Sequence, residues 1–383
     1  MFTDGLCNER KRAYLAGLEH LLRLDTQARA GIRNATPPPA ASLQSENVAF
    51  GRAAMRACGV VLAWLAVVPA SAQSQPTWEQ WQHLVGIVDL GARDDGTLVA
   101  MVNGRLVTVA PDSGVATPFA NGQGGFSADP TVESYFVAAD QLPGNATCPR
   151  RTDDLYILDL SSPPGIARVD SSGQANRFAT LTGVDTLGGI ALDTVGKFGY
   201  RLLVTGTHDG NQTTVFSVDC GGRSTVLTTA APLVEGGLAI APPTFGHFGG
   251  DLIASDENSG QVWAIDASGS AFLVTVPNLP TGGDTGVESE GFVPPGFISS
   301  GKPAFAYLSD RGTPDNPFPG TDSLLRLSSG ALAAAGVQDG DLLVATEGNG
   351  TTVAIRCADT CTSFPVAQGP QGGHIEGHLL IVP

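Results

Sequence analysis

The sequence predicts an all-β protein, and within that class a β-propeller of six four-stranded blades whose ring is closed by the C-terminal strand. Three observations support this prediction. From residue 84 onward no long stretch has the 3.6-residue apolar period of a helix, and short alternating runs are bounded by Gly, Asp, Asn and Pro. Two segments repeat one another, and one strand pattern recurs six times. A period of roughly 45 to 60 residues with four strands each fits a propeller.

The two segments that repeat one another lie in the middle of the chain. They are GGIALDTVGKFGYRLLVTGTHDGNQTTVFSVDCGG (188–222) and GGLAIAPPTFGHFGGDLIASDENSGQVWAIDASG (236–269). Each predicts a glycine-led apolar strand, a Phe-Gly turn, a second strand, an acidic turn and a third strand ending in Asp. A β-sandwich is the alternative fold, but it does not explain this self-similarity.

The third-strand pattern occurs six times, which indicates six units. The last two copies begin at Leu324 and Thr352, too close together for a full blade between them. The final segment, HIEGHLLIVP (374–383), has the pattern of an innermost strand with no blade after it. In a closed ring this strand joins strands from the N-terminal end and removes the exposed sheet edges. The six copies are RLVTVAPDSG (105–114), GIARVDSSG (165–173), VFSVDCGG (215–222), VWAIDASG (262–269), LLRLSSG (324–330) and TVAIRCADT (352–360).

Residues 55–72, MRACGVVLAWLAVVPASA, have the pattern of a secretory signal peptide: a Met and an Arg, an apolar run, and a small-residue cleavage site. The apolar run is too short to span a bilayer. A buried core helix could have a similar run, but the polar sequel QSQPTWEQ fits an exposed new N-terminus. We expect cleavage after Ala72 and a secreted or periplasmic product that begins at Gln73.

The segment 1–54 differs in composition from the rest of the chain, since it holds seven of the 21 basic residues and the run ATPPPAAS. We interpret residues 1–54 as an upstream extension from a wrongly chosen start codon, or else as a disordered tail. They are excluded from the predicted fold. The remaining chain is divided into a short N-terminal segment, 73–83, and the propeller, 84–383.

The charge of the expected mature chain excludes some classes of partner. Residues 73–383 carry 13 basic and 32 acidic side chains, a net charge near −19. Such a surface repels phosphate backbones and anionic lipids, so we expect no nucleic-acid partner and no stable membrane insertion. It suits a soluble, exported monomer that binds cations.

Four cysteines lie beyond the expected cleavage site, and an even number in an exported chain indicates disulfides. Cys357 and Cys361, in CADTC, can close a local bridge across a strand-to-strand turn. That leaves Cys148 to pair with Cys220. A metal site is the competing interpretation, but there is no C-x-x-C and no pair of His ligands at zinc spacing.

The segments FGGDLIASDENSGQVWAID and SEGFVPP resemble blades of six-bladed propellers of the gluconolactonase/SMP-30/NHL-like group. The resemblance covers most of 84–383 at the level of the repeat pattern. In the lactonase branch, a Glu-Gly at the start of an inner strand supplies a carboxylate to a calcium ion in the central channel. Glu290 and Glu376 match that local motif. The Asn and Asp ligands of that branch have no match here, so the resemblance does not carry the activity over.

Three predicted inner strands begin with Glu-Gly, at Glu235, Glu290 and Glu376. Since inner strands start at one rim of the channel, we expect these carboxylates to ring one mouth. Several carboxylates on one rim repel each other unless a cation or protons join them, and calcium favours oxygen ligands. A bound calcium ion is one interpretation. The other is that each Glu-Gly is a structural repeat whose glutamate bonds loop amides. Acidic or amide-rich loops would surround the mouth: 207–212, 255–260, 310–322 and 346–350.

Other chemical groups give weaker signals. The turn DENSG, with Glu257, has the residue types of an ordinary hairpin turn. His374 at the rim is a candidate acid or base, whereas we expect His378 to be packed. No G-x-S-x-G nucleophile elbow occurs.

Two classes of function therefore remain open. The first is a secreted propeller that binds a cation, a small molecule or a protein partner at the acidic channel face without chemistry. The second is a calcium-dependent hydrolase or lyase of the lactonase-like type, in which a cation polarises a carbonyl. Propellers host both functions, so the fold does not decide between them.

Overall fold

The computed structural model describes residues 75–139, 142–210 and 212–382. The predicted extension and signal peptide lie outside the described residues. None of the helices in the described ranges has the length and apolarity needed to cross a membrane.

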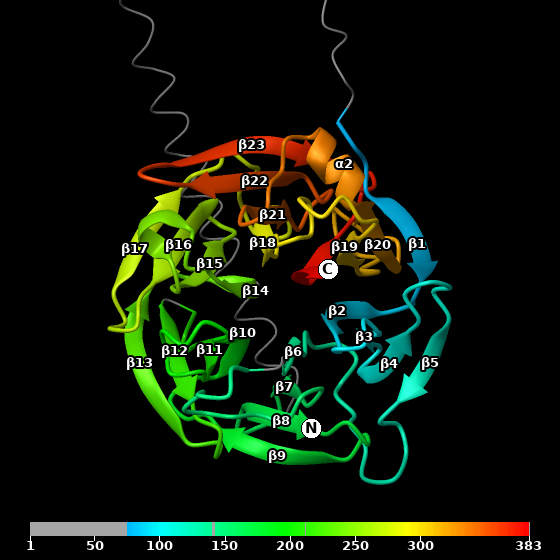
Figure 1. Ribbon diagram of the computed structural model, residues 1–383. Coiled ribbons are helices and arrows are strands. Elements are labelled where there is room, and N and C mark those ends of the chain that lie inside the picture. The colour runs from blue at the N-terminus through cyan, green and yellow to red at the C-terminus, as the bar shows by residue number, and fades with distance from the viewer. Residues whose placement is uncertain (1–74, 140–141, 211, 383) are drawn as a thin grey trace, which may run out of the picture. The chain divides into compact units, whose positions relative to one another are not determined.

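The described strands form six four-stranded antiparallel sheets, which surround a central channel (Figure 1). This confirms the predicted six-bladed β-propeller. In each blade the second strand from the channel is almost wholly buried, because both of its faces pack between neighbouring sheets. The outermost strands carry many exposed residues. The short apolar runs in the sequence therefore mark the second and third strands of the blades.

Blades 1 to 4 each use four strands that follow one another along the chain, from the innermost to the outermost. Blade 1 contains β2 (Ile87–Ala92), β3 (Leu98–Val102), β4 (Arg105–Val109) and β5 (Ala116–Phe119). Blade 2 contains β6 (Phe136–Ala138), β7 (Leu155–Asp159), β8 (Gly165–Val169) and β9 (Ala175–Thr180). Blade 3 contains β10 (Thr186–Leu192), β11 (Leu202–Thr207), β12 (Thr213–Val218) and β13 (Ser224–Ala231). Blade 4 contains β14 (Glu235–Ile240), the 3-10 turn η1 (Gly246–Phe248), β15 (Leu252–Asp256), β16 (Gln261–Ile265) and β17 (Ala271–Thr275).

Blades 5 and 6 are interleaved. After the first strand of blade 5 the chain builds two strands of blade 6, returns through a short helix to finish blade 5, and ends as the innermost strand of blade 6. This explains why the last two third-strand patterns lie so close together in the sequence: they belong to different blades. Blade 5 contains β18 (Val287–Phe292), β21 (Leu342–Thr346), β22 (Thr352–Cys357) and β23 (Cys361–Ala367). Blade 6 contains β24 (Ile375–Val382), β19 (Phe305–Asp310), β20 (Ser323–Ser328) and β1 (Glu79–His83), with helix α2 (Ser329–Ala334) between the two blades in sequence.

The ring is closed inside blade 6, as the sequence predicted. The C-terminal β24 pairs with β19, and the N-terminal β1 pairs with β20 at the outer edge of the same sheet. The position of β1 corrects the predicted domain boundary, because this strand lies in the segment 73–83 that we placed outside the propeller. Its residues, EQWQH, are exposed or half-buried. An outer edge strand therefore lacks the apolar run that marks the inner ones.

The cysteines follow the prediction in part. Cys357 and Cys361 form a disulfide between directly paired positions of β22 and β23, with a Cα–Cα distance of 4.1 Å. The second predicted bridge is not formed, since Cys148 and Cys220 are free thiols. The two groups are nevertheless neighbours: burial, together with a hydrogen bond to the Cys220 thiol, raises the pKa of Cys148 to about 12.

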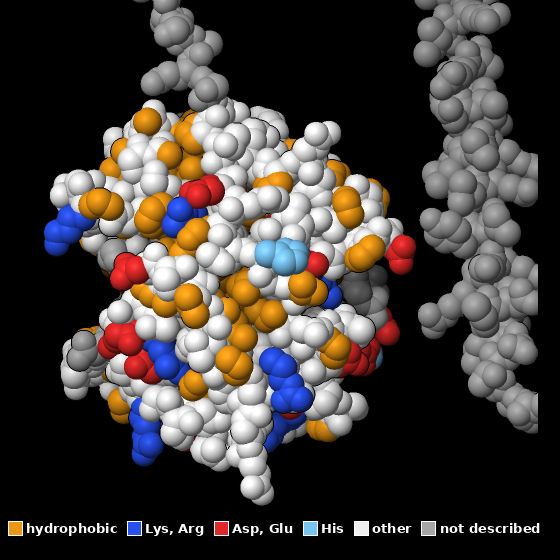
Figure 2. Space-filling model, turned by 90° about the vertical axis from the view of Figure 1, so that its right-hand side faces the viewer, with side chains coloured by type: hydrophobic (Ala, Val, Ile, Leu, Met, Phe, Trp, Pro, Cys, Tyr) orange, Lys and Arg blue, Asp and Glu red, His pale blue; other side chains and the backbone are white. Residues whose placement is uncertain are grey.

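The side of the ring viewed in Figure 2 has a mixed surface. Acidic and basic side chains are interspersed, with small groups of hydrophobic side chains between them. A few large apolar side chains are individually exposed, among them Val85 and Val115. Single exposed apolar residues are normal for a soluble protein. The channel and its two mouths, described below, show more specialised chemistry.

The N-terminal segment is attached to both interleaved blades, and this attachment can be tested at Trp78. The indole is buried, and its Nε1 donates a hydrogen bond to Thr352 Oγ1 at 2.9 Å, so it links the start of β1 to blade 5. We expect Trp78→Ala to lower the free energy of unfolding by about 3–5 kcal/mol, because it leaves a large cavity and removes the hydrogen bond to Thr352. Chemical denaturation measures this. The control Val85→Ala, at an exposed position, should change it by less than about 0.5 kcal/mol. Equal effects of the two substitutions would contradict this role for Trp78.

Candidate functional site

One mouth of the channel is lined by acidic side chains. A cavity of about 350 Å³ lies here, which we call the acidic mouth. Two of the three predicted glutamates line it: Glu235, the first residue of β14, and Glu376, the second residue of β24. Five further carboxylates join them, together with one arginine and one histidine. The charged lining residues are Glu133, Glu235, Glu257, Asp284, Glu288, Glu347, Glu376, Arg311 and His374.

The third predicted glutamate, Glu290, does not lie at the acidic mouth. On β18 this position is taken by Glu288, and Glu290 lines a different cavity at the other end of the channel. Residues two apart on a strand share a face but lie about 6.6 Å apart along it. The strand therefore reaches the rim two residues earlier than the Glu-Gly pattern suggests. The first glutamate of VESEGF, Glu288, is the one that lies at the rim.

The glycines that follow these glutamates are required by the close approach of the inner strands. A Cβ on Gly236, whose φ is +84°, would lie 2.0 Å from the carbonyl oxygen of Glu288 on the next blade. A Cβ on Gly291 would lie 1.9 Å from the carbonyl oxygen of Leu379. A side chain at either position would push the inner strands apart. The close approach of the inner strands thus explains the glycine of the Glu-Gly pattern.

Tyr135 connects several of the carboxylates, just before β6. Its hydroxyl lies 2.6 Å from Glu376 Oε2, 3.0 Å from Glu288 Oε1 and 3.4 Å from Glu133 Oε2. A phenol has one proton to donate, and burial keeps the pKa of Tyr135 well above its ordinary value. The hydroxyl therefore satisfies one carboxylate, and the others need a proton or a cation of their own.

His374 brings two more carboxylates together. Its Nε2 lies 3.2 Å from Glu347 Oε1 and 3.1 Å from Glu376 Oε1, and the donor atoms of the three residues all lie within 4.8 Å of one another. The backbone N–H of His374 donates to Asp310 Oδ1 at 2.7 Å, which fixes the residue at the end of β19. The imidazole is buried, and its Nδ1 has no hydrogen-bond partner among the described residues.

Arg311 supplies the only guanidinium among the residues that line this mouth. Its Nη1 donates to Glu133 Oε1 and, at 3.3 Å, to Glu376 Oε1. One arginine and one histidine face seven carboxylates. The fixed charge of the site is therefore strongly negative when the carboxylates are ionised.

Burial, together with this imbalance, raises the pKa values of several of these carboxyl groups. Removal from water, with the charges of the neighbouring carboxylates, raises the pKa of Glu347 to about 9. The same two causes raise the pKa of Glu235 to about 7, although this side chain stays accessible to solvent at the open rim. The pKa of the Glu288 carboxyl is raised well above its ordinary value by burial, and then by Glu376 and Glu235. In the absence of a cation, the site therefore retains protons at neutral pH.

The donor set fits a hard divalent cation. It consists of carboxylate oxygens with one amide, Asn316, and one imidazole. Calcium takes six to eight oxygen ligands, and a cation between repelling carboxylates removes the need for protons. The arrangement can hold such an ion, polarise a bound carbonyl, or transfer protons through groups whose pKa is raised toward neutrality.

The side chain of His378, on β24, reaches across the channel to β2 and β10. Its Nδ1 lies 3.0 Å from both carboxylate oxygens of Asp89 on β2, and its Nε2 lies 2.9 Å from the carbonyl oxygen of Ile190 on β10. Both ring nitrogens can donate only if the ring is charged. Burial lowers the pKa of His378, but Asp89 and the carbonyl together outweigh this, and the net pKa is raised. The expectation that His378 is packed is confirmed.

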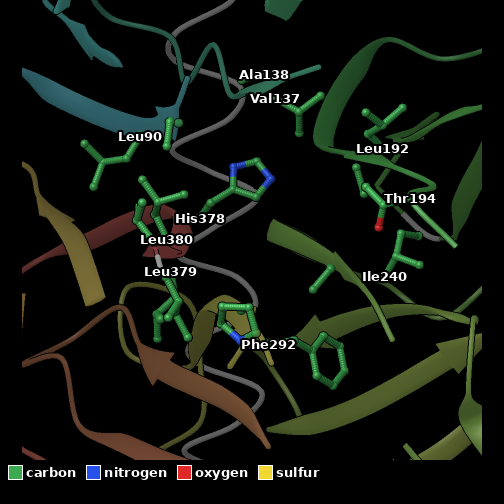
Figure 3. Close-up of a pocket in the computed structure, with 18 of the residues that line it drawn as sticks. Leu90, Val137, Ala138, Leu192, Thr194, Ile240, Phe292, His378, Leu379 and Leu380 are labelled. Carbon is green, nitrogen blue, oxygen red and sulfur yellow. The ribbon is translucent and has the colours of Figure 1, made fainter. Parts of the chain in front are cut away.

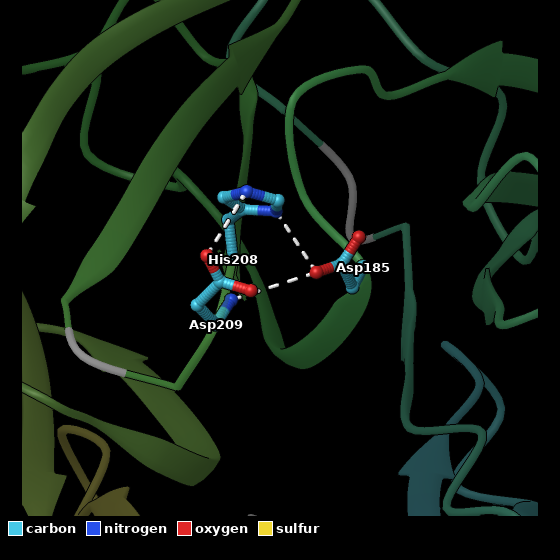
Figure 4. Close-up of side chains that lie close together, drawn as sticks. All are labelled: Asp185, His208 and Asp209. Carbon is cyan, nitrogen blue, oxygen red and sulfur yellow. Dashed lines mark hydrogen bonds and ion pairs between the residues drawn. The ribbon is translucent and has the colours of Figure 1, made fainter.

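A second cluster of possible metal ligands lies on the surface. Asp185, His208 and Asp209 come together around the turn after β11 (Figure 4), with a His208 Nδ1–Asp185 Oδ2 distance of 2.8 Å. All three side chains are more than 60% exposed. Exposed acidic groups in a turn need no ion, because water solvates them. The acidic mouth is the more constrained of the two sites.

Sequence reasoning placed the loops 255–260, 310–322 and 346–350 at this mouth, but it named none of their side chains as site residues. Glu257 was expected to be an ordinary turn residue, but the turn after β15 folds over the mouth, and burial raises the pKa of its carboxyl. One signal was available for Glu347, since TEGNG contains a fourth Glu-Gly. Glu133 and Arg311 follow no such pattern, because they reach the site from irregular segments.

The chain was compared with known proteins. No protein-family model matches it, and no curated protein matches it significantly. Among solved structures it is similar to a streptogramin B lyase (9% identity, 74% of this chain and 70% of that chain, TM-score 0.42). It is also similar to a putative TolB from Agrobacterium tumefaciens (14% identity, covering 79% of this chain and 92% of that chain, TM-score 0.40). A third similar structure is a gluconolactonase from Xanthomonas campestris (14% identity, covering 77% of this chain and 79% of that chain, TM-score 0.42).

A gluconolactonase is thus among the matched structures. TM-scores near 0.4 at such low identity support no statement about the activity of this chain. The assignment as a six-bladed propeller rests on its own strand order.

The raised pKa values predict a pH dependence of stability when no cation is present. Glu347 and Glu235 bind protons more tightly in the folded than in the unfolded chain, so the free energy of unfolding should fall as pH rises from about 4.5 to about 9. Glu347→Gln should flatten this slope by at most about 1.4 kcal/mol per pH unit. Denaturation with chelator present, across this range, measures it.

The matched control for this prediction is Glu79→Gln. Glu79 is an exposed residue whose pKa is lowered by its hydrogen bond to Arg326. This substitution should leave the slope between pH 5 and 9 unchanged, because the folded and unfolded carboxylates are both ionised there. A wild-type stability that is flat across this range would contradict the account of the acidic mouth.

Proposed function

We propose that this protein is an exported propeller that binds a divalent cation, foremost calcium, at the acidic mouth. The observation that carries the proposal is the grouping of Glu347, His374 and Glu376, whose donor atoms lie within 4.8 Å of one another in a cavity with seven carboxylates and one arginine. Such a group is stable when ionised only if positive charge is added.

Calcium suits the donor set better than a softer metal does. Glu347 and Glu376 would supply the central carboxylates, with Glu235 and Glu257 completing the oxygen shell from blade 4. His374 would orient the two central carboxylates, since its Nε2 already lies within 3.2 Å of both. A thiolate or a second imidazole, which zinc sites use, is not among the residues that line this cavity.

The same site would serve to bind a partner. A cation held at an open rim can accept oxygen atoms of a small molecule or of a protein in its remaining coordination positions. The Cys357–Cys361 disulfide supports export to an oxidising compartment, because such bridges are rare in the cytosol. An acidic surface that repels phosphates is consistent with a partner other than a nucleic acid.

Calorimetric titration tests the proposal on the chelator-treated protein. Calcium should bind with one-site stoichiometry, and at 100 times the dissociation constant it should add about 2.7 kcal/mol to the free energy of unfolding. Glu376→Gln should weaken binding at least tenfold, because a central carboxylate becomes a neutral amide.

The control is Glu290→Gln, the same chemical change on the neighbouring inner strand. Glu290 faces the other end of the channel, so this variant should bind calcium like the wild type. Absence of calcium binding in the wild type would refute the proposal. Equal weakening by both substitutions would refute the assignment of ligands.

One observation favours catalysis as a second candidate function. Glu235 lies at the solvent-accessible rim of the mouth, where its carboxylate could take a proton from a molecule held by the cation. A calcium-dependent hydrolase or lyase would use it as base, with His374 as a further candidate. A panel of five- and six-membered lactones, followed by acid release, tests this. Calcium-dependent turnover should disappear in Glu235→Gln, and an inactive wild type would leave binding as the function.

A further inference from the structure

The end of the channel opposite the acidic mouth opens into a second cavity, of about 710 Å³. We call it the apolar cavity, because its wall is formed by aliphatic and aromatic side chains at the ends of the inner strands. Figure 3 shows Leu90, Leu192, Ile240, Phe292 and Leu380 around it, with His378 at its floor. Its volume lies within the range of small-molecule sites, roughly 300–1,000 Å³.

Glu290, on the inner strand β18, has unused hydrogen-bonding capacity at this cavity. Glu290 is 1% exposed, and its Oε2 accepts a hydrogen bond from Ser255 Oγ at 2.7 Å. Its other oxygen, Oε1, is buried and has no hydrogen-bond partner within the described part of the chain. Leaving such an atom unpaired costs about 1–3 kcal/mol. A group of this kind facing a cavity is explained if a ligand satisfies it.

The other polar groups of the cavity do not offer such an anchor. Both ring nitrogens of His378 are already engaged, with Asp89 and with the carbonyl oxygen of Ile190. Arg93 lies beside Asp94 and Asp95 in the turn between β2 and β3, and its Nε and Nη2 also lack hydrogen-bond partners among the described residues. Its guanidinium, however, stacks on the Phe119 ring, 4.1 Å from the ring centre. Thr194, the remaining polar side chain of the lining, is exposed. A ligand between the inner strands would therefore meet apolar walls and the free oxygen of Glu290.

We propose that the apolar cavity binds an apolar small molecule that carries a hydroxyl group, and that this hydroxyl bonds Glu290 Oε1. A hydroxyl both donates and accepts. It therefore satisfies this oxygen whether the carboxyl is ionised or neutral. The hydrocarbon part of the ligand contacts the walls formed by the inner strands of all six blades.

This site is separate from the proposed cation site. Glu290 and Glu288 lie on the same strand but line different cavities, which share no lining residue. The proposal does not rest on a bound cation. Chelation should leave binding at the apolar cavity unchanged.

A pair of fluorescent probes of matched shape tests the proposal on the full chain. We expect 1-pyrenemethanol to bind about tenfold more tightly than 1-methylpyrene, because only the former can bond Glu290 Oε1. Glu290→Leu should still bind both probes, but with about equal affinity. Glu290→Gln, which keeps a polar oxygen, should restore most of it.

A second pair of variants tests the location. Ile240→Trp places bulk in the cavity and should weaken both probes at least tenfold. Its control is Leu273→Trp, on the exposed side of the same blade, which should leave both affinities unchanged. Absence of any hydroxyl preference in the wild type would overturn the proposal, and so would probe binding that survives Ile240→Trp. Neither outcome depends on whether Glu290→Leu folds.

Discussion

The close approach of six inner strands around the channel is the constraint on which the rest of this structure depends. Between neighbouring blades the backbones come so near that a Cβ on Gly236 or Gly291 would overlap a carbonyl of the next strand. Glycine is therefore required at these positions, and the residues beside it are brought together from blades that are distant in sequence. Carboxylates that would be well solvated on separate turns become a cluster whose members repel one another. The chemistry of the acidic mouth follows from this geometry.

The interleaving of blades 5 and 6 contributes to the same site. Because β19 is inserted between β18 and β21 in sequence, the loop after β19 carries Arg311 to the rim. The C-terminal β24 places Glu376 beside it, together with His374, the residue that precedes the strand. The N-terminal β1 seals the outer edge of the same sheet. The closure of the ring and the assembly of the candidate site are thus performed by the same blade.

The fold could be predicted because its blades are repeats, and each repeat shows the same pattern of short apolar strands and turns rich in Asp and Gly. The site could be predicted only in part. Glu235 and Glu376 follow the repeat and were found, whereas Glu290 was placed at the wrong end of the channel, because the motif fixes a glycine but not the depth of the carboxylate before it. Glu257 and Glu133 come from turns and irregular segments, whose paths are set by tertiary contacts. The polar edge strand β1 was missed for a related reason, since it buries too little to show a pattern.

Terbium luminescence tests the central claim, that the acidic mouth holds a cation, most directly. Terbium substitutes for calcium at oxygen-rich sites, and its emission is sensitised by a phenol close to the ion. The hydroxyl of Tyr135 lies 2.6 Å from Glu376 Oε2, so excitation of tyrosine should produce terbium emission. We predict that this emission is displaced by calcium and is strongly reduced in Tyr135→Phe. Absence of any calcium-displaceable emission from the wild-type protein would contradict the account.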